Sequence, residues 1–237
     1  MSTTSNDNHT HISQKFDQDL SYLRSQLLNM GGVVERQVTD SVDALISSNS
    51  DLAEAVRDKE NDVDDMEVAI DENCTQIIAL RQPAASDLRL VISIIKMVAD
   101  IERIGDEASK IAGLAIRLSE EGKAPRGYVE IRHISDHVSQ MFNSALDAFA
   151  RLDVEMAISI MKEDQNVDAE YKSAIRSLMT FMMEDPRSIS QIHSVLWVLR
   201  ALERIGDHAC NIAEHVIYIV KGKDVRHMPL KQAEKLL

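Results

Sequence analysis

The amino-acid sequence predicts an all-α protein made of two tandem three-helix bundles that are related by internal duplication. Apolar residues recur at alternating spacings of three and four almost throughout, as they do in helices that bury one face. Glycine (8) and proline (4) are scarce among the 237 residues, which disfavours a sheet protein with many tight turns. The string Glu-Arg-Ile-Gly-Asp occurs at residues 102–106 and again at 203–207, which indicates two equivalent halves.

Three helices are predicted in the first half of the chain. The first contains a coiled-coil-like seam of apolar residues from 16 to 45, and the pair Gly31–Gly32 within it indicates close packing or a bend. The second should begin at the N-cap candidates Ser50–Asp51 and end before Pro83. The third should begin near Ser86–Asp87 and continue through the first Glu-Arg-Ile-Gly-Asp string.

The apolar pattern starts again in the second half. A fourth helix is predicted over residues 131–148 and a fifth over residues 157–182, with Pro186 ending the fifth. A sixth helix, over residues 192–217, should end near Gly222.

Domain boundaries follow from the segment Gly-Lys-Ala-Pro-Arg-Gly, which is the clearest linker in the chain. We expect residues 1–122 to form the N-terminal three-helix bundle, with residues 1–12 as a flexible tail. Residues 123–126 should be the linker, and residues 127–237 the C-terminal three-helix bundle.

Composition and charge restrict the classes of partner. The formal net charge of −13 disfavours nonspecific binding of nucleic acid, because phosphates would be repelled at long range. Cations, metal ions and basic protein surfaces remain as partners. The N-terminus is polar and lacks the apolar region of a secretion signal, and no stretch approaches the roughly 20 apolar residues that span a bilayer. We therefore expect a cytoplasmic protein.

The repeated strings carry the strongest chemical signal. Each places a Glu and an Asp four residues apart, which puts both carboxylates on one face of a helix. The second and fifth predicted helices contain similar pairs, which align across the halves. The candidate metal ligands are Glu60, Asp64, Glu102, Asp106, Asp164, Asp168, Glu203 and Asp207. The alternative is that such pairs form a solvated helix face, or that Arg103 and Arg204 neutralise the neighbouring acids as ion pairs.

Placement favours a metal site for the two repeated strings. Continuing the apolar seams of the third and sixth helices leads to Glu102 and Glu203, and an inward carboxylate is costly unless it is paired or binds a cation. Facing carboxylates form a hard, oxygen-rich site that suits Fe, Mn, Mg or Ca. Gly105 and Gly206, each just before the second carboxylate, would allow close approach of a neighbouring backbone or of bridged ions.

The other candidate ligands carry less information. His193, His208 and His215 have no histidine counterparts in the first half, and we expect them to be packing or surface residues rather than ligands. Cys74 and Cys210 have no metal-ligand spacing. We expect both to be small buried residues in a reducing compartment rather than a disulfide.

The duplicated helices and the paired acidic motifs resemble the PhoU family, bacterial regulators associated with the high-affinity phosphate transporter. The segment Pro83-Ala-Ala-Ser-Asp-Leu-Arg89, which leads into Asp100-Ile-Glu-Arg-Ile-Gly-Asp106, carries the same resemblance, which covers about residues 16–220. It implies that the eight acids bind multinuclear metal clusters, with iron foremost and Mn, Mg, Zn or Ca as alternatives.

The same resemblance implies a role in regulation. The chain would be a negative regulator of the phosphate-starvation response and a modulator of phosphate uptake. It would act as an adaptor between the ATP-binding subunit of the phosphate transporter and the phosphate-sensing histidine kinase. The resemblance further implies a homodimer that reaches the membrane only through its partners.

Two other functions compete with this interpretation. A carboxylate-bridged di-iron enzyme needs a Glu-x-x-His motif on each of two helices, and the chain has only Glu130 with His133. No nucleophile context or phosphate-binding glycine loop is present either, so we expect no enzyme. A purely structural helical scaffold would bind no stoichiometric metal, and removing its motif acids would leave signalling unchanged.

Overall fold

The described part of the protein is almost entirely helical, as the sequence predicts. The computed structural model describes residues 4–226 and 228–236, with side chains from residue 15 onward. Within that part there is no strand. The elements are α1 (Thr4–Ser47), α2 (Ser50–Asp58), α3 (Glu60–Arg81), α4 (Ala85–Glu121), α5 (Tyr128–Arg151), α6 (Val154–Glu184), the 3-10 turn η1 (Pro186–Ser188), α7 (Ile189–Lys221), α8 (Leu230–Ala233) and the 3-10 turn η2 (Glu234–Leu236).

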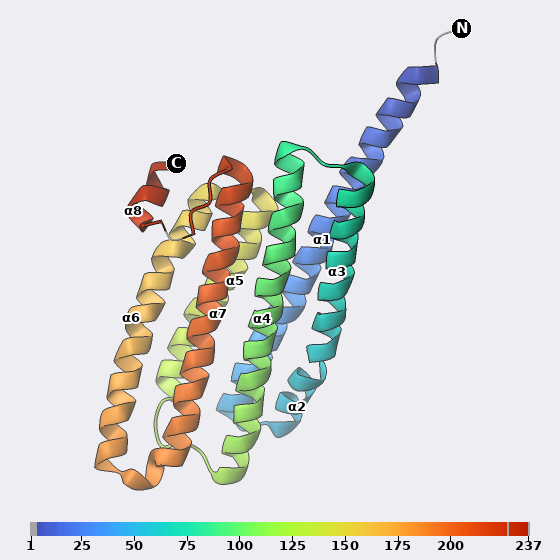
Figure 1. The fold of residues 1–237 in the computed structure, drawn as a ribbon. Helices are drawn as coiled ribbons and strands as arrows, with labels where there is room; N and C mark the ends of the chain where they lie inside the picture. The colour runs from blue at the N-terminus through green and yellow to red at the C-terminus, as the bar shows by residue number, and fades with distance from the viewer. Residues whose placement is uncertain (1–3, 227, 237) are drawn as a thin grey trace.

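The long helices form two equivalent three-helix units that lie side by side. In the first unit α1, α3 and α4 pack together, and in the second α5, α6 and α7 do so. The units meet where α4 packs against α7 and α1 packs against α5. Figure 1 shows α3, α4, α7 and α6 in front, with α1 and α5 behind them. This arrangement confirms the predicted all-α fold of duplicated three-helix units.

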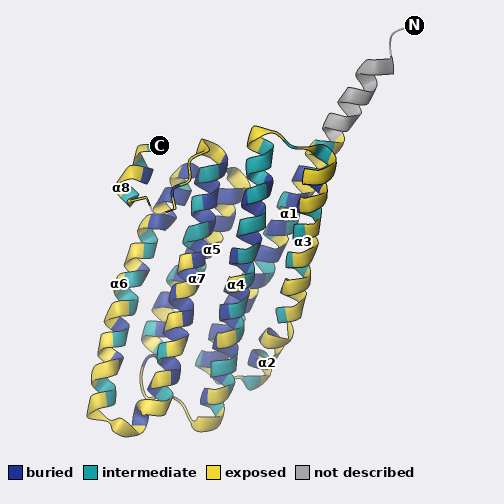
Figure 2. Ribbon diagram, in the orientation of Figure 1, coloured by how far each residue is buried: buried dark blue, intermediate teal, exposed yellow. Residues whose placement is uncertain are grey.

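The two units share one hydrophobic core. Buried apolar residues from α1 through α8 form a single contiguous cluster, and the exposed residues lie on the outward faces of the helices (Figure 2). With only 4% aromatic residues, the core is filled mainly by aliphatic side chains, although Phe142 and Phe149 are both fully buried. Every long helix therefore buries an apolar stripe, as the spacing of three and four predicts.

The second predicted helix is the clearest departure from the sequence-based expectation. We expected one continuous helix up to Pro83, but the chain breaks at Lys59 into α2 and α3. The backbone N–H of Lys59 bonds to the carbonyl of Val56, three residues back, so the ladder tightens there. Val56 and Val63 are buried on either side of the break, which explains why the apolar pattern continues through it.

Smaller differences concern helix ends. Asn49, and not Ser50 or Asp51, is the N-cap of α2, because its side chain accepts a hydrogen bond from the backbone N–H of Leu52 at 3.1 Å. Ser50 instead bonds to Ser119 Oγ on α4 at 2.7 Å. Helix α4 begins at Ala85, one residue before the predicted start, and has no side-chain cap. Sequence patterns locate helix ends only to within one or two residues.

The ends of the chain also differ from expectation. Helix α1 begins at Thr4, so residues 4–12, expected as a flexible tail, follow a helical path, whereas residues 1–3 lie outside the described part. Beyond Gly222, α8 and η2 fold back along α6, where Lys162 Nζ lies 2.7 Å from Glu234 Oε1. The sequence analysis did not predict this element, which is too short to carry a recognisable period.

Close helix packing explains one of the two glycines in α1. A Cβ added at Gly31 would lie 2.6 Å from Leu146 Cδ2 on α5, whereas one at Gly32 would meet nothing within 4 Å. Gly31 therefore allows α1 and α5 to approach where the two halves meet, and this is the close packing that the sequence indicated. Across the described residues, no helix is long and apolar enough to cross a membrane.

Candidate metal centre

The first group of predicted ligands lies where α3 packs against α4. Glu60 and Asp64 lie in the first turns of α3, and Glu102 and Asp106 lie in the middle of α4. We call these four residues the first cluster. Asp64 and Asp106 are near enough for their charges to interact across the two helices. The structure thus brings both predicted pairs of this half together, and their binding of metal stays a prediction.

Repulsion among these carboxylates changes their acidity. Burial, followed by the charges of Asp106, Glu67 and Asp64, raises the pKa of Glu102 to about 7. Burial, with the charges of Glu60 and Asp106, also raises the pKa of Asp64. Each shift means that a negative charge at that position is unfavourable in the protein alone. A bound cation would relieve it.

Glu67 belongs beside this cluster and was missed by the sequence analysis. Burial and the charges of Asp71, Asp64 and Asp106 raise its pKa, while Arg103 lowers it. Its position could have been found, because residues 60, 64 and 67 repeat at the spacing of one helix face. The aligned residue in the second half is Tyr171, so the acidic pairs alone did not indicate it.

The second group lies in the equivalent place between α6 and α7. It consists of Asp164, Asp168, Glu203 and Asp207, and we call it the second cluster. Burial, then Asp207 and Asp168, raise the pKa of Asp164 to about 6. Burial and Asp207 raise the pKa of Glu203, and burial and Asp168 raise that of Asp207. These four carboxylates therefore also face one another.

Basic side chains distinguish the second cluster from the first. Lys172 Nζ lies 2.7 Å from Asp168 Oδ2, and Arg200 Nη1 lies 2.7 Å from Glu203 Oε1. The aligned positions of the first half hold Val68 and Ala99, which carry no charge. There, Lys110 Nζ reaches Asp106 Oδ2 only at 3.9 Å, and Ser109 donates a hydrogen bond to Glu60 Oε2 at 2.6 Å. The first cluster thus keeps more unneutralised negative charge.

Arg103 and Arg204 only partly neutralise the neighbouring acids, which was the alternative to a metal site. Arg204 extends across to α4, where Nη1 lies 3.0 Å from Glu107 Oε1, so it links the two halves. Arg103 lowers the pKa of Glu102 and Glu67, which places its charge near the first cluster. Arg204 also lowers the pKa of Asp207, so each arginine partly offsets the charge of the cluster beside it.

The donor set fits a hard metal ion. Both clusters offer carboxylate oxygens from two adjacent helices, and Glu203, which is 8% exposed, has its Oε2 buried with no hydrogen-bond partner among the described residues. An added Cβ at Gly206 would lie 3.4 Å from Val138 Cγ1 and 3.8 Å from Asp164 Oδ1, both ordinary contacts, so the acids do not require a glycine there. At Gly105 the close neighbour is Gln37 Oε1 of α1, at 3.3 Å.

The carboxylate oxygens of the eight predicted ligands lie far apart. In the part of the chain that is described, no three of these eight carboxylates bring oxygens within 4.8 Å of one another. A single ion held by a closed shell would need them closer. Ions that bridge several carboxylates, or a modest inward rotation of the side chains, would suit this geometry.

Comparison with known proteins identifies the family. Residues 27–115 and 131–216 each match the PhoU domain, one match in each half of the chain. The chain belongs to the PhoU family. A Pseudomonas putida protein described as a phosphate-specific transport system accessory protein PhoU homolog is 61% identical over 222 residues, which cover 94% of this chain and 87% of that protein.

Solved PhoU structures share the fold. The crystal structure of PhoU from Pseudomonas aeruginosa superposes with a TM-score of 0.86 at 59% identity, and covers 88% of this chain and 100% of its own. The phosphate transport system regulatory protein PhoU from Streptococcus pneumoniae gives a TM-score of 0.82 at 30% identity, and covers 89% of this chain and 99% of its own. The PhoU fold thus extends over both halves.

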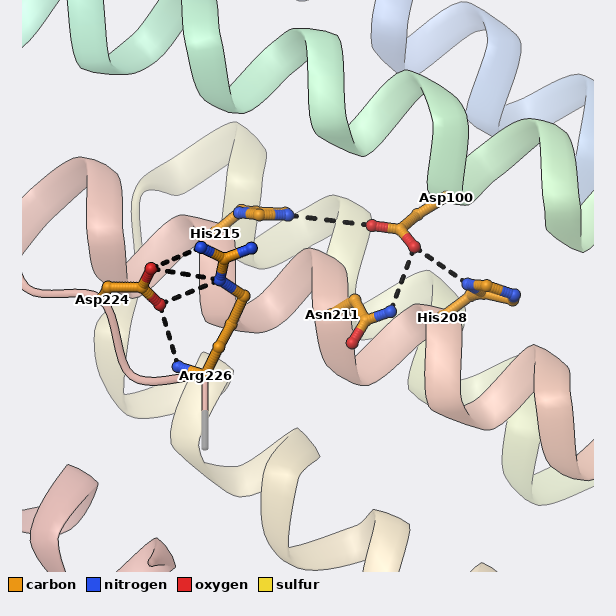
Figure 3. A network of polar contacts seen from close by, with 6 residues as sticks. All are labelled: Asp100, His208, Asn211, His215, Asp224 and Arg226. Carbon is orange, nitrogen blue, oxygen red and sulfur yellow. Dashed lines mark hydrogen bonds and ion pairs between the residues drawn. The ribbon is translucent and has the colours of Figure 1, made fainter. Parts of the chain in front are cut away.

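Two histidines of this PhoU-family chain lie between its halves. Figure 3 shows His208, Asn211 and His215 of α7 pointing toward Asp100 of α4. His208 Nδ1 lies 2.9 Å from Asp100 Oδ1, Asn211 donates to the same oxygen at 3.1 Å, and His215 Nε2 lies 3.8 Å from Oδ2. Both histidines are buried, as expected of packing residues, although no local pattern in the sequence indicates their partner Asp100.

The sequence disfavours His193 and the two cysteines of this PhoU-family chain as metal ligands. His193 is exposed and accepts a hydrogen bond from Trp197 Nε1 at 3.2 Å. Cys74 is buried, Cys210 is half-buried, and both are free thiols. Burial raises the pKa of Cys74 to about 12 and raises that of Cys210 as well, which keeps both protonated and unreactive.

Proposed function

We propose that this protein is a negative regulator of the phosphate-starvation response and a modulator of high-affinity phosphate uptake. Its relatives are described as accessory or regulatory proteins of the phosphate transport system, which supports a role in regulating phosphate transport. The observation that carries the proposal further is the pair of acidic clusters at equivalent places in both halves. Their unfavourable charges provide a reason for a cation to bind.

Metal binding is the first part of the proposal. The first cluster would hold its ion through Glu60, Asp64, Glu102 and Asp106, with Glu67 as a further donor. The second would use Asp164, Asp168, Glu203 and Asp207 after Lys172 and Arg200 move aside. A multinuclear cluster, with iron foremost and Mn, Mg, Zn or Ca as alternatives, would supply positive charge that ties the two helices of each half together.

Contact with partners is the second part. The protein would join the ATP-binding subunit of the phosphate transporter to the phosphate-sensing histidine kinase, and it would inhibit by contact rather than by catalysis. The metal clusters would shape or bridge the contact surface on α3, α4, α6 and α7. We further propose a cytoplasmic homodimer that meets the membrane only through these partners.

The experiment that tests the regulatory role measures alkaline phosphatase in phosphate-replete cells that lack this protein. The deletion should give high enzyme output, which the wild-type protein should silence. A variant in which the repeated strings keep their shape but lose charge should fail to silence it. That variant is Glu102→Gln, Asp106→Asn, Glu203→Gln and Asp207→Asn.

A matched control separates loss of the clusters from a general loss of negative charge. It neutralises four exposed acids outside the clusters, and it should silence the response like the wild type. These are Asp17→Asn, Glu54→Gln, Asp147→Asn and Glu155→Gln. Low output in the deletion itself would overturn the regulatory role. Full silencing by the cluster variant would favour a structural scaffold in which the acids are only a solvated face.

Metal content provides a separate measurement for the same variants. Protein purified without chelators should contain more metal per chain in the wild type and in the exposed-acid control than in the cluster variant. Equal metal in all three would show that the acidic strings hold no ion. Steady-state oxidase turnover by the metal-loaded wild type would instead support the di-iron enzyme.

A further inference from the structure

We propose that His133, His137 and Glu170 form a second kind of metal site, selective for Zn²⁺ and chemically similar borderline ions, which joins α5 to α6. This site is separate from the acidic clusters and does not depend on the proposed regulatory function. The two histidines are four residues apart on α5, so their rings share one face of that helix. Glu170 comes from the adjacent helix α6.

The distances between donor atoms fit a zinc coordination sphere. His133 Nδ1 and His137 Nδ1 each lie 3.2 Å from Glu170 Oε2. In tetrahedral zinc sites, bonds of about 2.1 Å to nitrogen and oxygen place neighbouring donors about 3.4 Å apart. One donor atom from each of the three residues lies within 4.8 Å of the other two, and this is the only such group of three among the described residues.

Hydrogen bonding alone does not account for the arrangement. The contact from His133 to Glu170 has hydrogen-bond geometry, but His137 Nδ1 is a buried atom with no hydrogen-bond partner among the residues described, despite its short distance to the carboxylate. The two rings stand 4.7 Å apart and are tilted by 49°. An ion placed among the three donors would satisfy the lone pair of His137 that the protein leaves unmet.

The duplicated half provides an internal comparison. The domain matches begin at residues 27 and 131, and Glu60 aligns with Asp164, so the first two helices of each half are related by an offset of 104 residues. At that offset the first half has Asn29, Val33 and Met66 in place of the three ligands. The helix contact is therefore made without them in one half, so packing does not require this trio.

The surroundings leave one coordination position open. His133 and Glu170 line a cavity of about 360 Å³ together with Val129, Glu130, Ile134, Ser173, Ala174 and Ser177. An ion with three protein ligands and an open fourth position would face this cavity and would bind water there. A set of two imidazoles and one carboxylate suits Zn²⁺, whereas the all-carboxylate clusters suit harder ions.

Cobalt provides the first test, because four-coordinate Co²⁺ absorbs strongly in the visible range and Co²⁺ in all-oxygen octahedral sites absorbs weakly. Wild-type protein titrated with Co²⁺ should develop the strong bands, and Zn²⁺ should displace them. His133→Ala should weaken binding by more than about 100-fold, since the loss of even outer-shell partners costs 10–100-fold. The His133 side chain is 62% exposed, so this variant should fold normally.

Four further variants make the test specific. His137→Ala and Glu170→Gln should also lose the strong bands. His193→Ala, which removes an exposed histidine on α7, should keep them, and so should Asp164→Asn combined with Asp207→Asn in the second cluster. Strong bands that survive in His133→Ala and His137→Ala, or their absence from the wild type, would overturn the proposal.

Thermal unfolding supplies a second readout. Zn²⁺ binds the folded protein and should raise the Tm of the wild type and of His193→Ala. At concentrations that saturate the wild type, Zn²⁺ should raise the Tm of His133→Ala by less than that of the wild type, because any Zn²⁺ held by the acidic clusters acts equally on both proteins. An equal rise in His133→Ala would assign the stabilisation to other residues and would contradict the site.

Discussion

Asp100 is a buried carboxylate of the first half whose polar contacts come from the second half. His208, Asn211 and His215 surround its two carboxylate oxygens, and Asp100 is only 6% exposed. Replacing it by alanine would leave these buried groups without their acceptor, and a buried group without a partner costs roughly 1–3 kcal/mol. We expect Asp100→Ala to lower the free energy of unfolding by about 2 kcal/mol.

Urea unfolding at pH 7.5 checks this prediction. The control is Asp17→Ala, which truncates an exposed aspartate of α1 and should change the free energy of unfolding by no more than about 0.5 kcal/mol. Equal small effects for the two variants would mean that the network around Asp100 contributes little to stability.

His215 should make stability depend on pH. Burial is the main cause that lowers its pKa; Lys96 and Arg226 also lower it, whereas Asp100 and Asp224 raise it. The folded state therefore binds fewer protons than the unfolded state below the usual histidine pKa of about 6.5. The stabilisation is present above that pH and is lost as the pH falls through it. We therefore expect the contribution of His215 to the free energy of unfolding to fall between pH 7.5 and 5.5.

Other groups titrate in the opposite direction, so the effect must be measured as a difference. Glu102 and Glu214 have pKa values raised to about 7, and both favour the folded state as the pH falls. The stability of the wild type minus that of His215→Gln should therefore shrink from pH 7.5 to 5.5. As a control, the free energy of unfolding of the wild type minus that of the exposed variant His193→Gln should stay constant between these two pH values. A constant difference for His215→Gln would contradict its lowered pKa.

The acidic residues were predictable from the sequence because the two members of each pair are close together in the chain. Glu102 and Asp106 are one helical turn apart, and spacing alone places them on one face. The contact of His208 with Asp100 spans 108 residues, and no local pattern encodes it. The trio of His133, His137 and Glu170 was only partly predictable. The spacing of the two histidines is visible in the sequence, but the position of Glu170 beside them depends on how α5 and α6 pack.

At the scale of single helices, the adjacent glycines of α1 should respond differently to alanine. Both lie inside a helix, where alanine is favoured over glycine by about 1 kcal/mol. Gly32→Ala should gain that amount, because nothing lies within 4 Å of the added methyl group. Gly31→Ala should gain less or lose stability, because Leu146 must move to admit the methyl group. Thermal unfolding of the two single variants measures the contrast, and equal gains would contradict the close approach of α1 and α5.

Helix number and extent were predictable where the apolar period is long. The six predicted helices appear, the second of them divided into α2 and α3. Proline cannot continue a helix beyond Pro83 or Pro186, and Gly222 ends α7 in the left-handed conformation that glycine adopts easily. The break at Lys59 was not predictable from the pattern, because the buried positions keep their spacing across it. The short helix α8 depends on contacts with α6, which local sequence does not specify.

On the scale of the whole molecule, the single shared core predicts cooperative unfolding. The buried residues of both halves form one contiguous cluster, so opening either half would expose apolar residues that pack against the other. Circular dichroism follows helices of both halves, and fluorescence of the single Trp197 follows α7. The two urea transitions should coincide. Separate midpoints would show that the halves are independent domains.

The duplication and the all-α class could be predicted, and they are confirmed. The repeated string and the helical period are properties of the chain itself. How the two units pack was not predictable, because the contacts of α4 with α7 and of α1 with α5 involve apolar surfaces that look alike on every helix. The domain boundaries at the linker stay a prediction, although α4 ends at Glu121 and α5 starts at Tyr128.

The network around Asp100 also determines which units can pair with each other. The second half has Ala201 at the position of Asp100, and the first half has Glu107 and Leu114 at the positions of His208 and His215. Two first units facing each other would set Asp100 against Glu107, and two second units would leave the histidines facing alanine. Unlike units are thus favoured over like ones. If the linker were cut, the two fragments would select each other from a mixture rather than their own copies.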